Sequence, residues 1–200
     1  GTGGSVFFAG TWRGGVFRTT DYGASWSAAN EGLTNNMIWT LTEGGDGAGG
    51  RYVYAGTQGG YVYRSSDAGL HWAQVKSGLT RQYVDCIALH PNDAGGCYMI
   101  AGTDVGPFLS TNNGTLWTKK AEGLLAGDPY VNILSAGFVP VVSGKPYAFV
   151  GVWGRGVWKR PMSDMVTSAG AIADNRPTHI ILDQNYPNPF NPSTTIHFEI

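Results

Sequence analysis

The 200-residue chain is 42% hydrophobic and only 14% charged, and it contains 31 glycines, a balance typical of an all-β protein with many tight turns. Its net charge is −1 and its basic residues form no run, which argues against binding to nucleic acid or to an anionic membrane surface. No stretch approaches the ~20 apolar residues of a membrane-spanning helix. The sequence starts at Gly1 without an initiating Met or a signal peptide, so we expect a processed chain or a fragment.

Alternating apolar residues, bounded by glycine-rich turns, predict strands in four successive units. The first unit has strands at 6–11, 15–19 and 26–28 and lacks the innermost strand of a four-stranded sheet. The second has four, at 37–42, 51–57, 60–65 and 71–75, and so has the third, at 84–89, 97–103, 107–110 and 116–119. The fourth has strands at 131–139, 146–152 and 156–160 and lacks the outermost one. Trp39 and Trp158 are expected in the core.

A short pattern, Ser/Thr-x-Asp/Asn-x-Gly-x-x-Trp, recurs three times, each time before the last strand of a unit. Its Trp residues are 46 and 45 positions apart (72 − 26 and 117 − 72), close to the ~40–45 residues of a propeller blade. An Asp or Asn side chain accepts hydrogen bonds from its own turn, and Gly permits positive φ. We therefore interpret the pattern as a structural turn rather than a catalytic site. Its residues are Thr19, Asp21, Gly23 and Trp26, then Ser65, Asp67, Gly69 and Trp72, then Ser110, Asn112, Gly114 and Trp117.

This pattern resembles the Asp box, or BNR repeat, of sialidase-like propellers, the sortilin ectodomain and some xyloglucan-cleaving glycoside hydrolases. The resemblance implies an all-β fold, a β-propeller of four-stranded antiparallel blades, with about three and a half to four blades in residues 1–160. In that family the box lies on the face opposite the active site. Because an open arc would expose blade faces and edges, we expect further N-terminal blades in the full-length protein. Closure with four blades is the alternative, and it needs two strands that the pattern does not supply.

The character of the chain changes after residue 160. Residues 161–178 contain few large apolar side chains and are expected to form a linker. In residues 179–200, the run Gln-Asn-Tyr-Pro-Asn-Pro-Phe-Asn-Pro resembles the start of the C-terminal sorting domain of type IX secretion cargo. That resemblance implies the first strands of an immunoglobulin-like domain, type IX secretion machinery as a partner, and a location outside the cell or on the outer-membrane surface of a Bacteroidota-like bacterium.

The two cysteines, Cys86 and Cys97, lie on adjoining expected strands. If the hairpin pairs Leu89 with Cys97, Cys86 faces Ile100 and no bridge forms without a shift of register. We therefore favour two buried free thiols, and a disulfide is the alternative for a secreted protein. No Cys/His spacing indicates zinc, and we expect neither a metal nor a cofactor.

The hairpins between the second and third strands should share one face with the loops that join the units, and loops commonly carry ligand sites. Two of these hairpins combine a Trp with an Arg: Trp12 with Arg13, and Trp153 with Arg155. A Trp ring can stack on a sugar, and an Arg can bind a carboxylate or hydroxyl groups, so these four residues are the candidate ligand site. The alternative is that the Trp rings pack between the units.

Asp104 is the candidate catalytic residue. The segment 102–106 resembles the one that bears a catalytic Asp in the xyloglucan-cleaving family, although Pro107 stands where a second Gly is usual. Glycoside hydrolysis needs two facing carboxylates, and the sequence pairs neither Asp85 nor Asp128 with Asp104.

A sialidase-like site would need an arginine cluster, whereas Arg13, Arg81 and Arg155 are scattered along the chain. We therefore expect a secreted or cell-surface bacterial propeller that binds a glycan or a protein ligand without catalysis. One alternative is an exported glycoside hydrolase, sialidase-like or xyloglucanase-like, with its active site partly on missing blades. The other is a mainly structural module of the cell surface.

Overall fold

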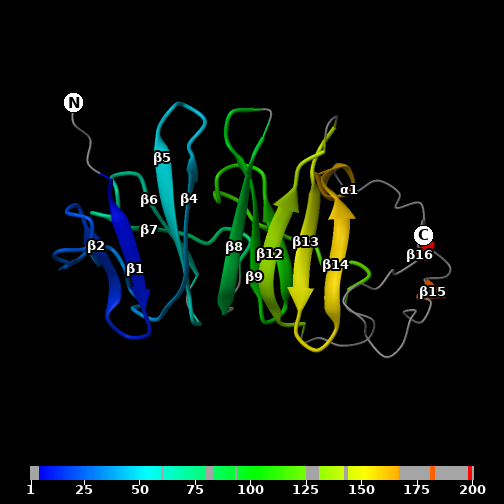
Figure 1. Cartoon of the computed structure of the whole chain (residues 1–200), viewed down its shortest axis with the longest axis horizontal. Helices are drawn as coiled ribbons and strands as arrows, with labels where there is room; N and C mark the ends of the chain where they lie inside the picture. The colour runs from blue at the N-terminus through cyan, green and yellow to red at the C-terminus, as the bar shows by residue number, and fades with distance from the viewer. Residues whose placement is uncertain are drawn as a thin grey trace, which may run out of the picture. The chain divides into compact units, whose positions relative to one another are not determined.

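The computed structural model describes residues 5–59, 61–79, 83–92, 94–124, 131–141, 144–166, 181–182 and 198–199. The chain divides into two compact units, Gly1–Val166 and Thr167–Ile200. The regular structure in the described part of the first unit is nearly all strand, in four antiparallel sheets that follow one another in chain order (Figure 1). In the second unit, β15 (Ile181–Leu182) pairs with β16 (Phe198–Glu199).

The sheets have the numbers of strands that the sequence predicts. The first and fourth sheets have three strands each, and the second and third have four. Their bounds are, for the first sheet, β1 (Phe7–Thr11), β2 (Gly15–Thr19) and β3 (Ser27–Ala28), and for the second, β4 (Ile38–Gly45), β5 (Arg51–Thr57), β6 (Val62–Ser65) and β7 (Ala73–Val75). The third sheet has β8 (Val84–Pro91), β9 (Cys97–Thr103), β10 (Gly106–Ser110) and β11 (Thr118–Lys119), and the fourth has β12 (Ile133–Val139), β13 (Tyr147–Val152) and β14 (Gly156–Pro161).

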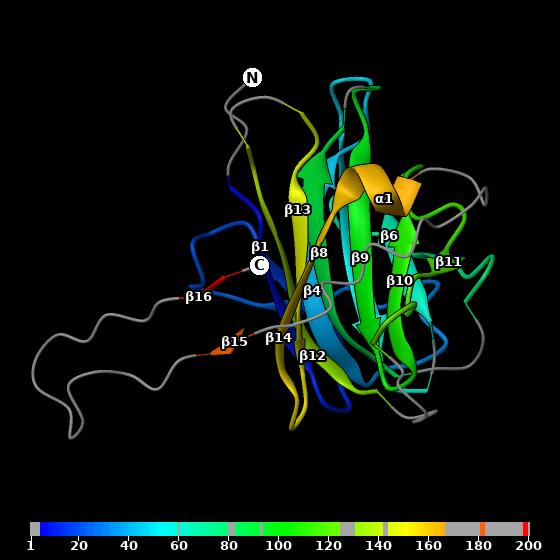
Figure 2. The same cartoon turned by 90° about the vertical axis from the view of Figure 1, so that its right-hand side faces the viewer.

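A short helix follows the last sheet. α1 (Met162–Val166) begins directly after β14, within the range that the sequence assigned to a linker, and its Met162 and Met165 are buried. These two side chains belong to the apolar cluster between the third and fourth sheets. Figure 2 shows α1 at the end of β14. Burial of these two apolar side chains stabilises the position of residues 162–166 against the sheets.

The core lies between neighbouring sheets. One apolar cluster joins the first sheet to the second through Val16 and Trp72, and another joins the second to the third through Val62 and Trp117. The third cluster joins the last two sheets and contains methionines of α1 but no Trp. The clusters keep the first strands of the second, third and fourth sheets side by side, with β4 against β8 and β8 against β12.

The repeated turns, at residues 19–26, 65–72 and 110–117, have one hydrogen-bond pattern. In the second copy, the Ser65 hydroxyl donates to Asp67 Oδ1 at 2.7 Å and accepts the N–H of Gly69 at 2.8 Å. Asp67 Oδ1 in turn accepts the N–H of His71 at 3.0 Å. These bonds favour the charged carboxylate, so they hold the pKa of Asp67 well below its usual range. The three non-glycine residues described with positive φ are Tyr22, Ala68 and Asn113, the same position in each copy.

The cysteine hairpin differs from the expected register. Pro91 pairs with Cys97 and Cys86 with Gly102, so the predicted pairing of Leu89 with Cys97 is wrong by two residues. The cause is a tight loop in which the Asn92 side chain accepts the N–H groups of Ala94 and Gly96, at 3.0 Å each, which lets both strands run further. Both thiols are free, as expected. Burial raises the pKa of Cys86 to about 11.

Candidate functional site

Four hairpins and the beginnings of three inner strands lie at the same end of the sheets, the lower end in Figure 1. The hairpins join β1 to β2, β5 to β6, β9 to β10 and β13 to β14, and the inner strands are β4, β8 and β12. We call this end the hairpin face. It carries all the residues that the sequence proposes for ligand binding or catalysis and that the structure describes.

Each inner strand has a β-bulge near its beginning. The register shifts between Ile38 and Thr40 in β4, between Val84 and Cys86 in β8, and between Ile133 and Ser135 in β12. A bulge bends the strand and re-aims the side chain of the extra residue. The extra residues are Trp39, Asp85 and Leu134, one from each sheet. Adjacent apolar residues interrupt the alternation at two of the three bulges, Ile38 with Trp39 and Ile133 with Leu134, and were the available signal.

Aromatic side chains stand exposed on the hairpin face. Trp12 is 50% exposed and Trp39 45%, and their rings meet edge to face with centroids 5.4 Å apart. Tyr83, in the loop before β8, is also exposed, and so is Trp153 in the last hairpin. The prediction of Trp39 as a core residue is therefore wrong, because the bulge turns its ring out of the sheet.

Asp85 and Asp104 interact electrostatically on the third sheet. Asp104 Oδ1 accepts the N–H of Tyr83 at 3.0 Å, which holds the hairpin against the preceding loop. Burial is the main cause that raises the pKa of Asp85, and the charge of Asp104 raises it further. Asp85 Oδ2 is buried without a hydrogen-bond partner in the described part of the chain. The site thus offers a half-buried carboxyl group with a raised pKa that interacts with a second Asp side chain.

The remaining predicted residues do not gather into one group. Arg13 is exposed beside Trp12 on the first sheet, whereas Trp153 and Arg155 are exposed on the fourth sheet, with two sheets between them. Arg81 and Asp128 lie outside the described residues. The Asp85–Asp104 pair was missed because the two are 19 positions apart in sequence. The one available signal was that Val84, next to Asp85, pairs with Thr103, next to Asp104.

No cluster of metal ligands is found in the described residues. A search among them for three or more neighbouring His, Cys, Asp or Glu side chains finds no group that could hold a metal ion. None of the helices in the described ranges is long and apolar enough to cross a membrane.

No family model and no curated protein matches the chain, but solved structures do. An ancestral GH74 enzyme is 20% identical, with a TM-score of 0.56, over 78% of this chain and 21% of its own. Two extracellular domains from B. thetaiotaomicron are also similar. The domain of a hybrid two-component system is 14% identical (TM-score 0.54, 90% of this chain and 23% of its own), and that of a one-component system 16% identical (TM-score 0.53, 83% and 22%).

These likenesses define the class of fold and nothing finer, since each is below 25% identity. The chain spans about a fifth of the length of the solved structures that it matches. Together with four successive antiparallel sheets of three or four strands, they show an all-β fold of the propeller type, as the sequence predicts.

Proposed function

We propose that this chain belongs to a secreted or cell-surface propeller whose hairpin face binds carbohydrate without catalysis. The observation that carries the proposal is the pair of exposed, mutually packed rings of Trp12 and Trp39, on the same face as the polar groups of Tyr83, Asp85 and Asp104. Flat aromatic faces favour the apolar C–H side of a sugar ring, and nearby carboxylates accept hydrogen bonds from its hydroxyls. A ligand that reaches Trp153 would cross several sheets, as an extended polysaccharide can.

The location outside the cell rests on separate observations. Two of the similar structures are extracellular domains. The repeated turns resemble Asp boxes, and residues 179–200 resemble the start of a type IX sorting domain, so both ends of the sequence favour an exported protein. In this proposal the C-terminal segment addresses the protein to type IX secretion, and the hairpin face supplies the binding function.

Binding to a panel of soluble polysaccharides, including xyloglucan and sialylated glycans, tests the proposal by titration calorimetry with the whole chain. We expect Trp39→Ala to lower the affinity about tenfold or more, equivalent to ~1.4 kcal/mol. The matched control is Trp158→Ala, because Trp158 is comparably exposed but lies on β14 away from the hairpins. No binding to any member of the panel, or equal losses in both variants, would contradict the proposal.

Glycoside hydrolysis is a second candidate, favoured by the Asp85–Asp104 pair. Hydrolysis of a glycosidic bond uses a pair of carboxyl groups, one of which has a raised pKa and donates the proton, and Asp85 would take that role beside Asp104. One of the similar structures is a GH74 enzyme. Release of reducing ends from the bound polysaccharide separates the candidates. A hydrolase should lose roughly 10²-fold or more of its rate in Asp104→Asn and in Asp85→Asn, whereas a binding protein releases none.

A further inference from the structure

Trp72 closes the junction between the first and second sheets by entering a slot made by the loop between them. Its backbone N–H donates to the Glu31 carbonyl at 2.8 Å, and its indole Nε1–H donates to the Ala29 carbonyl at 2.8 Å. The side chain is buried in a cluster with Leu33 packed against it. At Gly32 a Cβ would overlap the carbonyl oxygen of Trp72, so this glycine is required by the close approach.

Trp117 closes the next junction in the same manner. Its N–H donates to the Ser77 carbonyl at 2.8 Å, and Leu79 lies in the same apolar cluster. A Cβ at Gly78 would overlap the Trp117 carbonyl oxygen. The slot therefore has repeating parts: a backbone carbonyl that accepts from the Trp, a glycine beneath it, and a leucine beside the ring.

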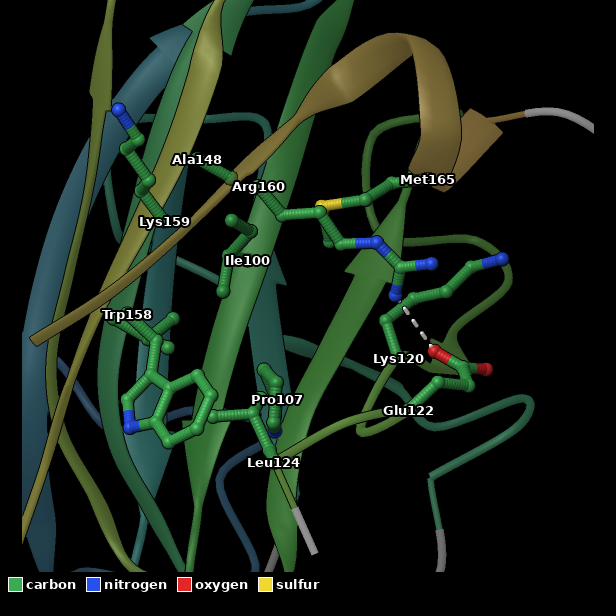
Figure 3. Close-up of a pocket in the computed structure, with 11 residues that line it drawn as sticks. Ile100, Pro107, Lys120, Glu122, Leu124, Ala148, Trp158, Lys159, Arg160 and Met165 are labelled. Carbon is green, nitrogen blue, oxygen red and sulfur yellow. Dashed lines mark hydrogen bonds and ion pairs between the residues drawn. The ribbon is translucent and has the colours of Figure 1, made fainter. Parts of the chain in front are cut away.

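The third junction has the same parts but no Trp. Leu124 donates its N–H to the Ala121 carbonyl at 3.0 Å, as Leu33 does to Asn30, and Gly123 has the positive φ of its two counterparts. Nothing in the described residues lies within 4 Å of a Cβ placed at Gly123. A pocket occupies the position instead, and Pro107, Lys120, Leu124, Trp158 and Met165 are among its lining residues (Figure 3).

Trp158 is exposed because this slot is open. It pairs with Val150, as Tyr63 pairs with Ala55 and Phe108 with Ala101 in the preceding sheets. Tyr63 and Phe108 are only 1% and 4% exposed, in the clusters that contain Trp72 and Trp117, whereas Trp158 is 41% exposed. The prediction of Trp158 as a core residue is wrong for this reason.

The edge of β14 next to the pocket is also unpaired in the described part of the chain. β6 pairs with β7 and β10 with β11, but β14 pairs only with β13. Arg160 pairs with Ala148, and this is the position that Ser65 and Ser110 hold in the preceding sheets. The hydroxyls of those two serines donate to Asp67 and Asn112 of the repeated turn. A cation thus stands where the other sheets have a hydroxyl that binds an acidic or amide side chain, and Arg160 Nη1 lies 3.0 Å from Glu122 Oε2.

We propose that β14 and this pocket form a docking site for an extended polypeptide segment that carries a tryptophan and, five positions before it, an aspartate. The segment adds to β14 as a fourth strand, its indole enters the pocket between Trp158 and Leu124, and its Trp N–H donates to the Glu122 carbonyl. The aspartate of the segment pairs with Arg160, which stands at the position from which Ser65 donates to Asp67 in the second sheet. Strand addition of this kind obtains affinity from main-chain bonds and specificity from the side-chain pocket. The site is separate from the hairpin face and does not depend on the proposed function.

A peptide with the sequence of residues 65–75 tests the proposal, because it contains both required residues, Asp67 and Trp72. Fluorescence anisotropy of the labelled peptide, titrated with the whole chain, should show saturable binding. Replacing the Trp of the peptide by Ala should weaken binding at least tenfold, and replacing its Asp by Asn should weaken it less. In the protein, Trp158→Ala and Arg160→Gln should weaken binding, whereas Trp153→Ala on the hairpin face should leave it unchanged.

Three outcomes would overturn the proposal: no binding of the peptide, equal binding of its Trp→Ala form, or equal effects of Trp158→Ala and Trp153→Ala. Circular dichroism of each variant checks that the fold is intact, and the peptide series itself gives a second measurement that needs no change in the protein. Analytical sedimentation of the chain without peptide tests whether a second copy of the chain occupies the site. Self-association that Trp158→Ala abolishes and that peptide does not reverse would show that a second copy of the chain fills the site.

Discussion

The junction between the second and third sheets and the junction between the third and fourth have loops of the same kind, but only the former has a fourth strand with a Trp packed on its loop. In the former, Trp117 is 2% exposed and its backbone N–H is bound by the Ser77 carbonyl. In the latter, Met165 of α1 packs near Leu124, and a pocket remains beside Trp158. The loop therefore keeps its shape without a Trp, since Gly123 has the positive φ of Gly78 and no described atom lies within 4 Å of a Cβ placed there.

The largest effect should come from emptying the closed junction. Trp117→Ala removes a fully buried indole from the cluster between two sheets, and the expected loss is ~3–5 kcal/mol in the free energy of unfolding. Urea denaturation followed by circular dichroism measures it. Trp158→Ala at the open junction is the control and should cost well under half as much, because that ring is already partly in water. Equal losses would mean that the two junctions do not differ in packing.

The two loop glycines should differ by a smaller amount. Both have positive φ, so alanine at either position carries a strain of about 1–2 kcal/mol. Gly78→Ala adds an overlap with the backbone of Trp117, whereas Gly123→Ala meets open space. We therefore expect Gly78→Ala to lower the midpoint of urea unfolding clearly more than Gly123→Ala does. If the two variants unfold at the same urea concentration, the carbonyl contact at Gly78 contributes nothing.

Much of the fold could be predicted because it repeats. The turn pattern with Asp67 and Trp72 indicated both the period and the last strand of each of the first three sheets, and the strand numbers followed. The conformation of such a turn is determined by residues that are close in sequence, so a sequence pattern can predict it. The residue before the glycine of the turn, for example Ala68, also has positive φ, and this was not predicted. A residue with a Cβ is held in that conformation by the hydrogen bonds of Asp67 and Ser65.

The candidate site was harder to predict because it depends on departures from the repeat. The bulges at Trp39 and at Asp85 each add one residue to a strand, and the strand pattern read from the sequence did not allow for an extra residue. The open junction that exposes Trp158 depends on what is missing beside β14 rather than on the residues of β14. The exposure of Trp158 depends on contacts between elements that are distant in sequence, so the residue pattern of one element alone does not predict it.

The smallest effect should be a pH dependence that distinguishes the first junction from the second. His71 Nδ1 lies 2.6 Å from Asp67 Oδ2, and its Nε2 lies 3.5 Å from Glu31 Oε2 in the loop of the first junction, whereas Leu116 holds the equivalent position at the second. The hydrogen bond to Asp67, helped by the charge of Glu31, raises the pKa of His71 above its usual 6.5. The folded state therefore binds this proton more tightly than the unfolded state, so the stabilisation is complete below pH 6.5 and is lost as the pH rises through the folded pKa. Urea unfolding between pH 5 and pH 9 should show a modest decline that His71→Gln removes, and the control Leu116→Gln should retain it. A decline that persists in His71→Gln would assign the pH dependence to other groups and leave the two junctions alike in this respect.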